Sequence, residues 1–148
     1  MIIDDHITID APVDVVWAVF SDVERWPEWT SSVRSASMVD ADTLREGVAV
    51  RMVQPRIPPT TWVVTDIEPG HAWTWTARSP GATTTATHLV DPIEPGRTRV
   101  AQRIEHRGWA GVLAGRLLRR QTRRYLRLEG EGLRRRSEEV WASRAAQA

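Results

Sequence analysis

Six short runs of alternating apolar and polar residues fill the stretch between residues 32 and 106, and they limit the possible folds more than any other feature. The runs are Val33–Val39, Val48–Val53, Thr61–Ile67, Ala72–Ala77, Thr83–Val90 and Arg97–His106. Glycine, proline and aspartate residues separate them, as expected at turns between strands. Consecutive strands at this spacing predict an antiparallel meander.

The turn Pro69-Gly70 predicts the register of one hairpin of the meander. With this turn as the tip, Val64 lies opposite Trp75 and Asp66 opposite Trp73. The same register puts four bulky apolar side chains on one face of the sheet: Trp62, Val64, Trp73 and Trp75.

The chain before the meander predicts one strand and two short helices. Ile2–Ile9 has the partial alternation of a strand. Asp10-Ala11-Pro12 then offers a cap and a first-turn proline, and apolar residues recur at helical spacing as far as Phe20. The capping-box sequence Ser21-Asp22-Val23-Glu24 predicts a second helix, which Pro27 disturbs.

The chain after the meander predicts one long helix from Gly108 to about Trp141. Gly130 and Gly132 weaken it and favour a bend, and residues 142–148 are expected to fray. A helical projection assigns the buried stripe to Ala110, Leu113, Ala114, Leu117, Leu118, Gln121, Tyr125 and Leu128. It assigns the solvent-exposed face to Arg116, Arg119, Arg120, Arg123, Arg127 and Arg134.

Composition excludes several classes of chemistry. The 148 residues suit a single domain spanning residues 1–148. The chain has no cysteine, lysine or asparagine, which excludes disulfides, thiolate metal sites, cysteine nucleophiles and Schiff-base lysines. The N-terminal sequence lacks the features of a secretory signal, and the expected location is the cytoplasm.

Several segments resemble a known superfamily. They are Ile7–Trp17, Asp22-Val-Glu-Arg-Trp-Pro-Glu-Trp29, Leu44–Gly47, Trp62–Pro69 and Gly96–Val100. Together they resemble the SRPBCC superfamily, also called START-like or Bet v 1-like, and within it the bacterial polyketide cyclase/dehydrase-like proteins. The resemblance covers nearly the whole chain.

The resemblance implies an α+β helix-grip fold, in which a curved antiparallel sheet of about seven strands wraps around a long C-terminal helix and encloses a cavity. In the aromatase/cyclase branch, cavity tryptophans correspond to Trp26 and Trp62. The catalytic arginine of that branch corresponds to Asp66, and its tyrosine to Val33, so two polar catalytic groups are replaced. Rieske oxygenase chemistry is excluded because the iron ligands are missing.

The first hypothesis for function is binding of a small hydrophobic, cyclic or lipid-like molecule between the sheet and the long helix. The tryptophans offer an apolar stacking wall, although aromatic residues at strand spacing also serve simply as core. Trp26 and Trp29 are candidates for a lid over the cavity. The predicted lining residues are Trp26, Trp29, Met52, Trp62, Val64, Trp73, Trp75, His88, Gln102, Leu113, Leu117 and Gln121.

The second hypothesis is a polyketide cyclase/dehydrase-type enzyme acting on a poly-carbonyl or aromatic substrate. Its candidate acid and base groups are His88, His106 and Asp66. A single histidine in a strand is more often a structural polar residue than a catalyst. Gln121 and Tyr125 could bind a ligand or reach backbone groups at the rim of the sheet. No metal-ligand spacing is present, and no cofactor is implied.

The third hypothesis is a protein-interaction module that uses the arginine-rich helix face. Arg119, Arg120, Arg123 and Arg127 could bind an acidic protein partner. Nucleic acid is not expected, because no aromatic residues alternate with these arginines to stack on bases. The net charge of +1 also favours a simple solvated face.

Overall fold

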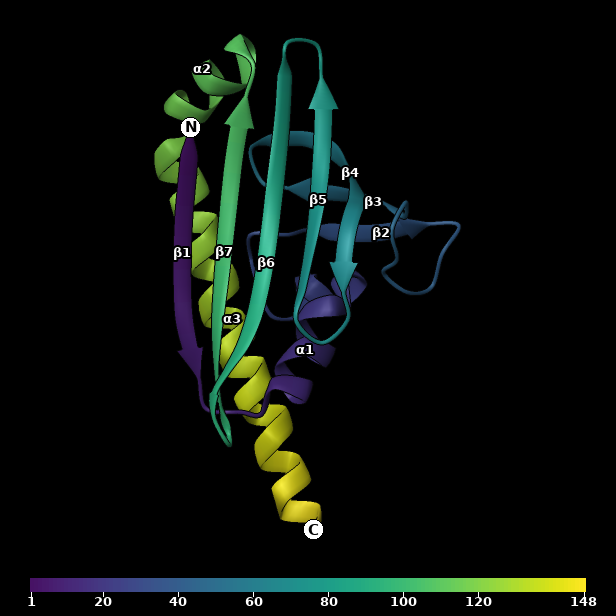
Figure 1. Ribbon diagram of the computed structural model, residues 1–148, viewed down its shortest axis with the longest axis vertical. Coiled ribbons are helices and arrows are strands. Elements are labelled where there is room, and N and C mark those ends of the chain that lie inside the picture. The colour runs from purple at the N-terminus through teal and green to yellow at the C-terminus, as the bar shows by residue number, and fades with distance from the viewer.

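The computed structural model describes all 148 residues as one curved antiparallel sheet that partly encloses a long helix (Figure 1). The seven strands follow the order β1-β7-β6-β5-β4-β3-β2. Every neighbouring pair is antiparallel. Their bounds are β1 (Ile2–Ile9), β2 (Ser35–Val39), β3 (Ala49–Gln54), β4 (Ile57–Glu68), β5 (Ala72–Ser79), β6 (Ala82–Glu94) and β7 (Arg97–Arg107). The predicted meander and N-terminal strand are therefore confirmed.

Two short helices connect β1 to β2, as the sequence predicts. They are α1 (Val13–Ser21) and the 3₁₀ helix η1 (Val23–Glu28). Pro12 precedes the first turn of α1, where its missing N–H leaves no donor unpaired. The capping box is not formed, because neither helix has a side-chain cap hydrogen bond. Instead, Trp26 anchors η1 by donating its indole N–H to the carbonyl of Phe20 at 2.8 Å.

The register of the β4–β5 hairpin is confirmed at one position and wrong at the next. Val64 pairs with Trp75 as predicted, but a bulge between Val64 and Asp66 moves Ile67 opposite Trp73. Asp66 pairs with Thr74 and is exposed. A bulge adds a residue to one strand and changes the side to which its side chains point. The predicted tryptophan face is nevertheless confirmed, because all four of its residues are buried.

The prediction of a single C-terminal helix is wrong, since the structure has two helices that meet at Leu118. They are α2 (Trp109–Leu117) and α3 (Arg119–Gln147). α2 packs on β6 and β7 at the top of Figure 1, while α3 crosses behind the sheet against β1 and α1. The break changes the direction of the helix, so one projection cannot describe both parts.

The break also corrects the predicted buried stripe. Leu113, Leu117 and Leu118 are exposed, and the buried residues of α2 are Gly111 and Gly115. The buried face of α3 is Tyr125, Leu126, Glu129, Gly130, Gly132, Leu133 and Ser137. The arginines assigned to the outer face are exposed as predicted.

The C-terminal part of α3 stays helical where bending and fraying were expected. α3 runs through Gly130 and Gly132 and extends to Gln147, and the fraying of residues 142–148 stays a prediction. Gly132 lies directly against the backbone carbonyl of Trp29, at a site with no room for a Cβ atom. This glycine therefore serves close packing. No helix of the structure is long and apolar enough to cross a membrane.

Candidate functional site

An aromatic cluster occupies the space between the concave face of the sheet, α1 and η1. Trp73 is central: its ring centroid lies 4.8 Å from that of Phe20 and 5.8 Å from that of Trp75. Trp75 in turn stacks on Trp62 at 5.7 Å. These rings bury large apolar areas and hold one another in offset and edge-to-face contacts. They form a rigid wall whose full membership is Trp17, Phe20, Trp26, Trp29, Trp62, Trp73, Trp75 and His88.

A row of polar residues crosses the concave face within this apolar surface. Asp5 of β1 pairs with Gln102 of β7, and Gln102 pairs with His88 of β6. His88 then pairs with Trp73 of β5. His88 and Gln102 are only 3% and 4% exposed. The sheet register therefore places three hydrogen-bonding side chains side by side, Gln102 and His88 buried and Asp5 partly exposed on the edge strand.

The tautomer of His88 is fixed by its surroundings. Nδ1 lies 3.3 Å from the carbonyl oxygen of Trp73, which can only accept, so Nδ1 carries the proton. Burial lowers the pKa of His88 to about 3, which outweighs the opposing effect of this hydrogen bond. The neutral ring therefore presents an unshared electron pair at Nε2. That atom accepts a hydrogen bond but is a weak base.

Several buried polar atoms lack partners in the chain. Four buried side-chain atoms have no hydrogen-bond partner: Trp62 Nε1, Trp73 Nε1, His106 Nε2 and Ser137 Oγ. His88 Nε2 and the Gln102 amide also form no hydrogen bond within the chain. The same holds for the indole N–H of Trp75, whose ring lies 5.0 Å from that of His88. The chain itself therefore supplies no hydrogen-bond partner to these three groups.

Glu129 of α3 is a functional candidate that sequence reasoning missed. It is 6% exposed, and burial raises the pKa of its carboxyl to about 8. The nearby Asp5 charge acts in the same direction, while the Ser32 hydroxyl, at 3.5 Å, opposes it. Glu129 is four residues from both Tyr125 and Leu133, so a correctly phased helical projection would have found it.

Gln121 and Tyr125 close one side of the interior. The Tyr125 hydroxyl donates to the carbonyl of Pro55, in the turn between β3 and β4. The Gln121 amide donates to the same carbonyl at 3.3 Å and to the Tyr125 oxygen at 3.0 Å. Both residues thus reach a backbone carbonyl at the rim of the sheet, and a role of Gln121 in ligand binding stays a prediction.

The remaining predicted residues divide into buried and surface groups. Met52 and Val64 are buried in the same core cluster as the tryptophans, and so is Val33. Leu113 and Leu117 are 54% and 77% exposed, so the prediction that they face the interior is wrong. The break at Leu118 and the glycine face of α2 explain that error. Trp26 and Trp29 are buried, which leaves their role as a lid a prediction.

The other two catalytic candidates lie away from the aromatic cluster. The bulge directs Asp66 to the solvent. His106 lies under α2, where its Nδ1 is 3.1 Å from the Thr84 hydroxyl and a Cβ at Gly115 would meet its ring. Burial and the N-terminal charge lower the pKa of His106. Only His88, of the three, belongs to the interior polar row.

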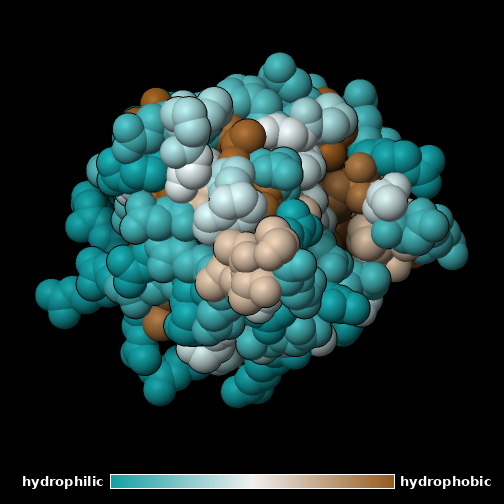
Figure 2. Space-filling model, turned by 90° about the horizontal axis from the view of Figure 1, so that it is seen from below, coloured by the Kyte–Doolittle hydropathy of each residue, from teal (hydrophilic) through white to brown (hydrophobic).

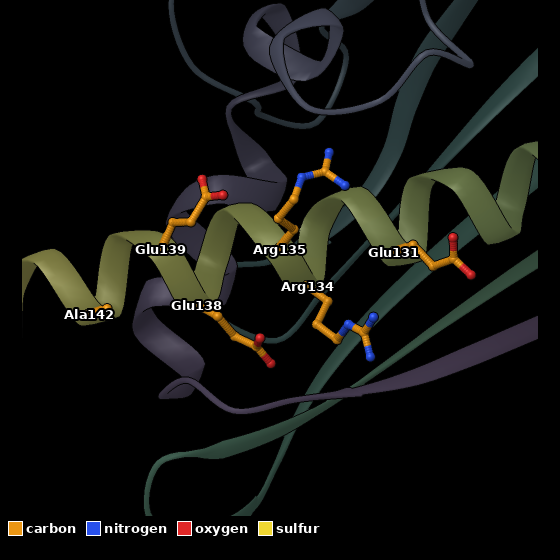
Figure 3. A pocket seen from close by; sticks show the side chains of 6 residues that line it. All are labelled: Glu131, Arg134, Arg135, Glu138, Glu139 and Ala142. Carbon is orange, nitrogen blue, oxygen red and sulfur yellow. The ribbon is translucent and has the colours of Figure 1, made fainter.

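Two hollows on the molecular surface are not part of this interior. One, of about 490 Å³, is lined only by residues of α3, as Figure 3 shows, with side chains spreading to both sides of the helix. The other, of about 440 Å³, lies between α1, the β2–β3 loop and the β4–β5 turn, and includes Trp17, Leu44 and Ile67. The end of the molecule seen in Figure 2 is mostly hydrophilic, with hydrophobic atoms in scattered patches. No group of three or more histidines and carboxylates is placed to hold a metal ion.

Comparison with known proteins relates this arrangement to a family. A protein of Streptomyces halstedii described as a "Putative polyketide cyclase" is 29% identical over 93 residues, which cover 63% of this chain and 74% of that protein. The Zhui aromatase/cyclase from Streptomyces sp. R1128 superimposes with a TM-score of 0.75 at 16% identity, over 93% of each chain. Norcoclaurine synthase from Thalictrum flavum gives 0.75 at 12% identity, over 95% of each chain.

A third structure, a hypothetical protein from Helicobacter pylori, has a TM-score of 0.78 at 13% identity, over 93% of this chain and 88% of that one. At these identities the solved structures establish the helix-grip fold alone. The family model described as "Polyketide cyclase / dehydrase and lipid transport" matches residues 2–138. The chain therefore belongs to the polyketide cyclase/dehydrase and lipid transport family.

Proposed function

We propose that the protein binds a small, largely hydrophobic, cyclic or lipid-like molecule between the concave face of the sheet and α3. The observation that carries this proposal is the Nε2 atom of His88, which has no hydrogen-bond partner in the chain and is set in a wall of buried tryptophans. A buried polar atom without a partner is costly, and a ligand that supplies the missing hydrogen bond removes the cost. Burial of apolar surface then provides most of the affinity.

The chemistry of the polar row defines the ligand more closely. His88 Nε2 accepts a hydrogen bond, so it suits a hydroxyl, phenol or enol of the ligand. The indole N–H of Trp75 and the amide of Gln102 can donate to a carbonyl. A planar ring with both a hydroxyl and a carbonyl would use these groups together while stacking on the tryptophans.

Quenching of tryptophan fluorescence tests whether ligands enter. A panel of polycyclic phenols, fatty acids and sterols is titrated into the wild type, Trp75→Leu and the control Trp141→Leu. Trp141 is on α3 and 40% exposed, away from the cluster. Saturable quenching by one ligand class that Trp75→Leu loses and Trp141→Leu retains would support the proposal. No saturable response to any ligand class in the wild type would overturn it.

A matched pair of ligands tests the role of His88. A phenol and its methyl ether differ only in the hydrogen-bond donor that His88 Nε2 accepts. The wild type should prefer the phenol by roughly tenfold, the value of one hydrogen bond. His88→Phe keeps an aromatic ring but has no acceptor, so the preference should disappear. An unchanged preference in that variant would exclude His88 as the acceptor.

Glu129 favours a second candidate function, an enzyme that moves protons on a poly-carbonyl or aromatic substrate. A carboxyl with a pKa of about 8 is mostly protonated at neutral pH and titrates just above it, so it can give a proton and take it back. In this function Glu129→Gln should abolish turnover while ligand affinity changes little. Mass spectrometry of a poly-carbonyl substrate incubated with each protein would detect the product, and equal turnover by both would exclude Glu129.

A further inference from the structure

α2 presents its bulky apolar side chains to the solvent. Trp109, Leu113 and Leu117 are 79%, 54% and 77% exposed. They are spaced four residues apart, so they form one stripe along the helix, about 12 Å long at 1.5 Å per residue. A contiguous exposed apolar surface of this kind commonly marks an interaction site.

The opposite face of α2 fixes this orientation. Gly111 and Gly115 are buried, and a Cβ added at Gly111 would meet Ala82 of β6 at 3.4 Å. At Gly115 an added Cβ would lie 2.6 Å from the ring of His106 on β7. The helix can approach the sheet this closely only through its glycine face. The apolar stripe is therefore held on the outside by the packing of the inner face.

A basic segment begins where the stripe ends. Six arginines follow within twelve residues, and no acidic residue occurs between Glu105 and Glu129. All six are exposed, and none forms an ion pair. They are Arg116, Arg119, Arg120, Arg123, Arg124 and Arg127. Arg116 is on α2 and the other five are on the first turns of α3. The stripe and these six arginines together are called the α2 face below.

We propose that the α2 face docks on the surface of an anionic lipid bilayer. In this arrangement Trp109, Leu113 and Leu117 enter the boundary between the headgroups and the acyl chains, and the arginines lie near the lipid phosphates. Tryptophan and leucine on one face with unpaired arginines nearby is the chemistry of helices that lie in a membrane interface. Unpaired arginines also add electrostatic attraction to anionic headgroups.

Charge argues against a second copy of the chain as the occupant. A two-fold dimer through the α2 face would bring the same surface from each copy together, as symmetric interfaces do. The arginines of both copies would then face each other without an acidic residue of the segment to balance them. An anionic bilayer instead offers apolar acyl chains to the stripe and phosphates to the arginines. This docking does not depend on a ligand in the interior.

Vesicle sedimentation tests the proposal with the full chain and no added ligand. Vesicles of phosphatidylcholine alone are compared with vesicles of phosphatidylcholine mixed with phosphatidylglycerol. Two variants change the α2 face at exposed positions: the double variant Leu113→Ser, Leu117→Ser and the double variant Arg119→Glu, Arg123→Glu. Two controls change exposed residues near the end of α3, Trp141→Ser and Arg144→Glu. Circular dichroism confirms that each variant is folded.

The wild type and both controls should bind the mixed vesicles, and raised salt should weaken this binding. Each α2-face variant should have a partition coefficient lower by roughly tenfold or more. Absence of wild-type binding to the mixed vesicles would overturn the proposal, and so would equal binding by the variants. Sedimentation velocity without lipid provides a further check: a dimer that both α2-face variants abolish would assign the face to a second copy and also overturn it.

Discussion

The imidazole of His88 stacks on the indole of Trp73, with ring centroids 4.1 Å apart and planes inclined by 12°. The same two residues are directly opposite each other on β5 and β6, and the ring of His88 donates to the Trp73 carbonyl. Stacking and hydrogen bonding together fix both the orientation and the tautomer of His88. The neutral ring is thus a structural consequence of its place on the sheet.

This relationship predicts a specific pH dependence for His88→Phe. The pKa of His88 is about 3 in the folded protein and 6.5 in the reference state. Between these values the unfolded chain binds a proton that the folded chain does not, so the free energy of unfolding falls as the pH falls through this range. His88→Phe should remove this dependence. Its stability at neutral pH should change by less than about 1.5 kcal/mol, because a similar ring replaces the imidazole.

Urea denaturation at several pH values between 3 and 6.5 measures the effect of His88→Phe. His6 lies on the exposed side of β1, so His6→Phe is the control and should keep the wild-type pH dependence. If His88→Phe loses stability in acid as steeply as the wild type, the burial of neutral His88 is not the cause of the acid sensitivity.

Glu129 predicts the opposite pH dependence between pH 4.5 and 8. Its carboxyl has a pKa of about 8 when folded and 4.5 in the reference state. Between these values the folded chain holds a proton that the unfolded chain has released, so this group makes stability fall as the pH rises from 4.5 to 8. Glu129→Gln keeps a neutral hydrogen-bonding side chain of similar shape. The variant should therefore gain stability relative to the wild type as the pH rises through this window.

The free energy of unfolding, measured by urea titration across the same window, tests Glu129→Gln. Glu131→Gln is the control, since Glu131 is exposed two residues away on α3. The control should follow the wild type at every pH. A constant difference between Glu129→Gln and the wild type at all pH values would show that burial does not raise the pKa of the Glu129 carboxyl above its value in the unfolded chain.

The sequence could predict the elements that depend on local pattern. Alternation identified the strands, and the turn at Pro69-Gly70 placed the buried tryptophans on one face. The bulge at Asp66 was not predictable, because it arises from the fit of β4 to both of its neighbours. Tertiary packing therefore decided where a single charged side chain points.

The C-terminal helices show a second limit of sequence analysis. A helical projection treats leucine as the buried residue, but on α2 the close approach to β6 and β7 requires the glycine face. Leu113 and Leu117 were misplaced for this reason, and the changed phase after Leu118 concealed Glu129. The buried polar groups of the site depend on such packing choices, which a hydrophobic pattern does not encode.

Tyr125 predicts a local rather than a global effect on stability. Its hydroxyl joins α3 to the carbonyl of Pro55, and Gln121 donates to the same carbonyl. Tyr125→Phe should cost about 1–2 kcal/mol, because the hydroxyl's hydrogen bonds to Pro55 and Gln121 are lost while the ring and the Gln121–Pro55 hydrogen bond remain. Amide exchange in the β3–β4 turn should become faster. Hydrogen exchange at the distant β6–β7 turn serves as the internal control and should not change, and an equal increase there would mean general destabilisation.

Gly130 and Gly132 of α3 predict opposite responses to the same substitution. Alanine is the better helix former by about 1 kcal/mol, and this gain applies to both positions. At Gly130 an added Cβ would make ordinary contacts, 3.6 Å from Ile7 and 3.7 Å from Asp5. At Gly132 it would overlap the backbone carbonyl of Trp29, which cannot move without shifting the end of η1.

Gly130→Ala should therefore raise the free energy of unfolding by up to about 1 kcal/mol, while Gly132→Ala should lower it by about 1–3 kcal/mol. Urea denaturation of both variants measures the difference, and near-ultraviolet circular dichroism reports the packing of Trp29. The two substitutions share their chemistry, their helix and nearly their position, so helix propensity cancels from the comparison. Equal effects would mean that Trp29 and η1 can move away from α3, which would remove the reason for a glycine at 132.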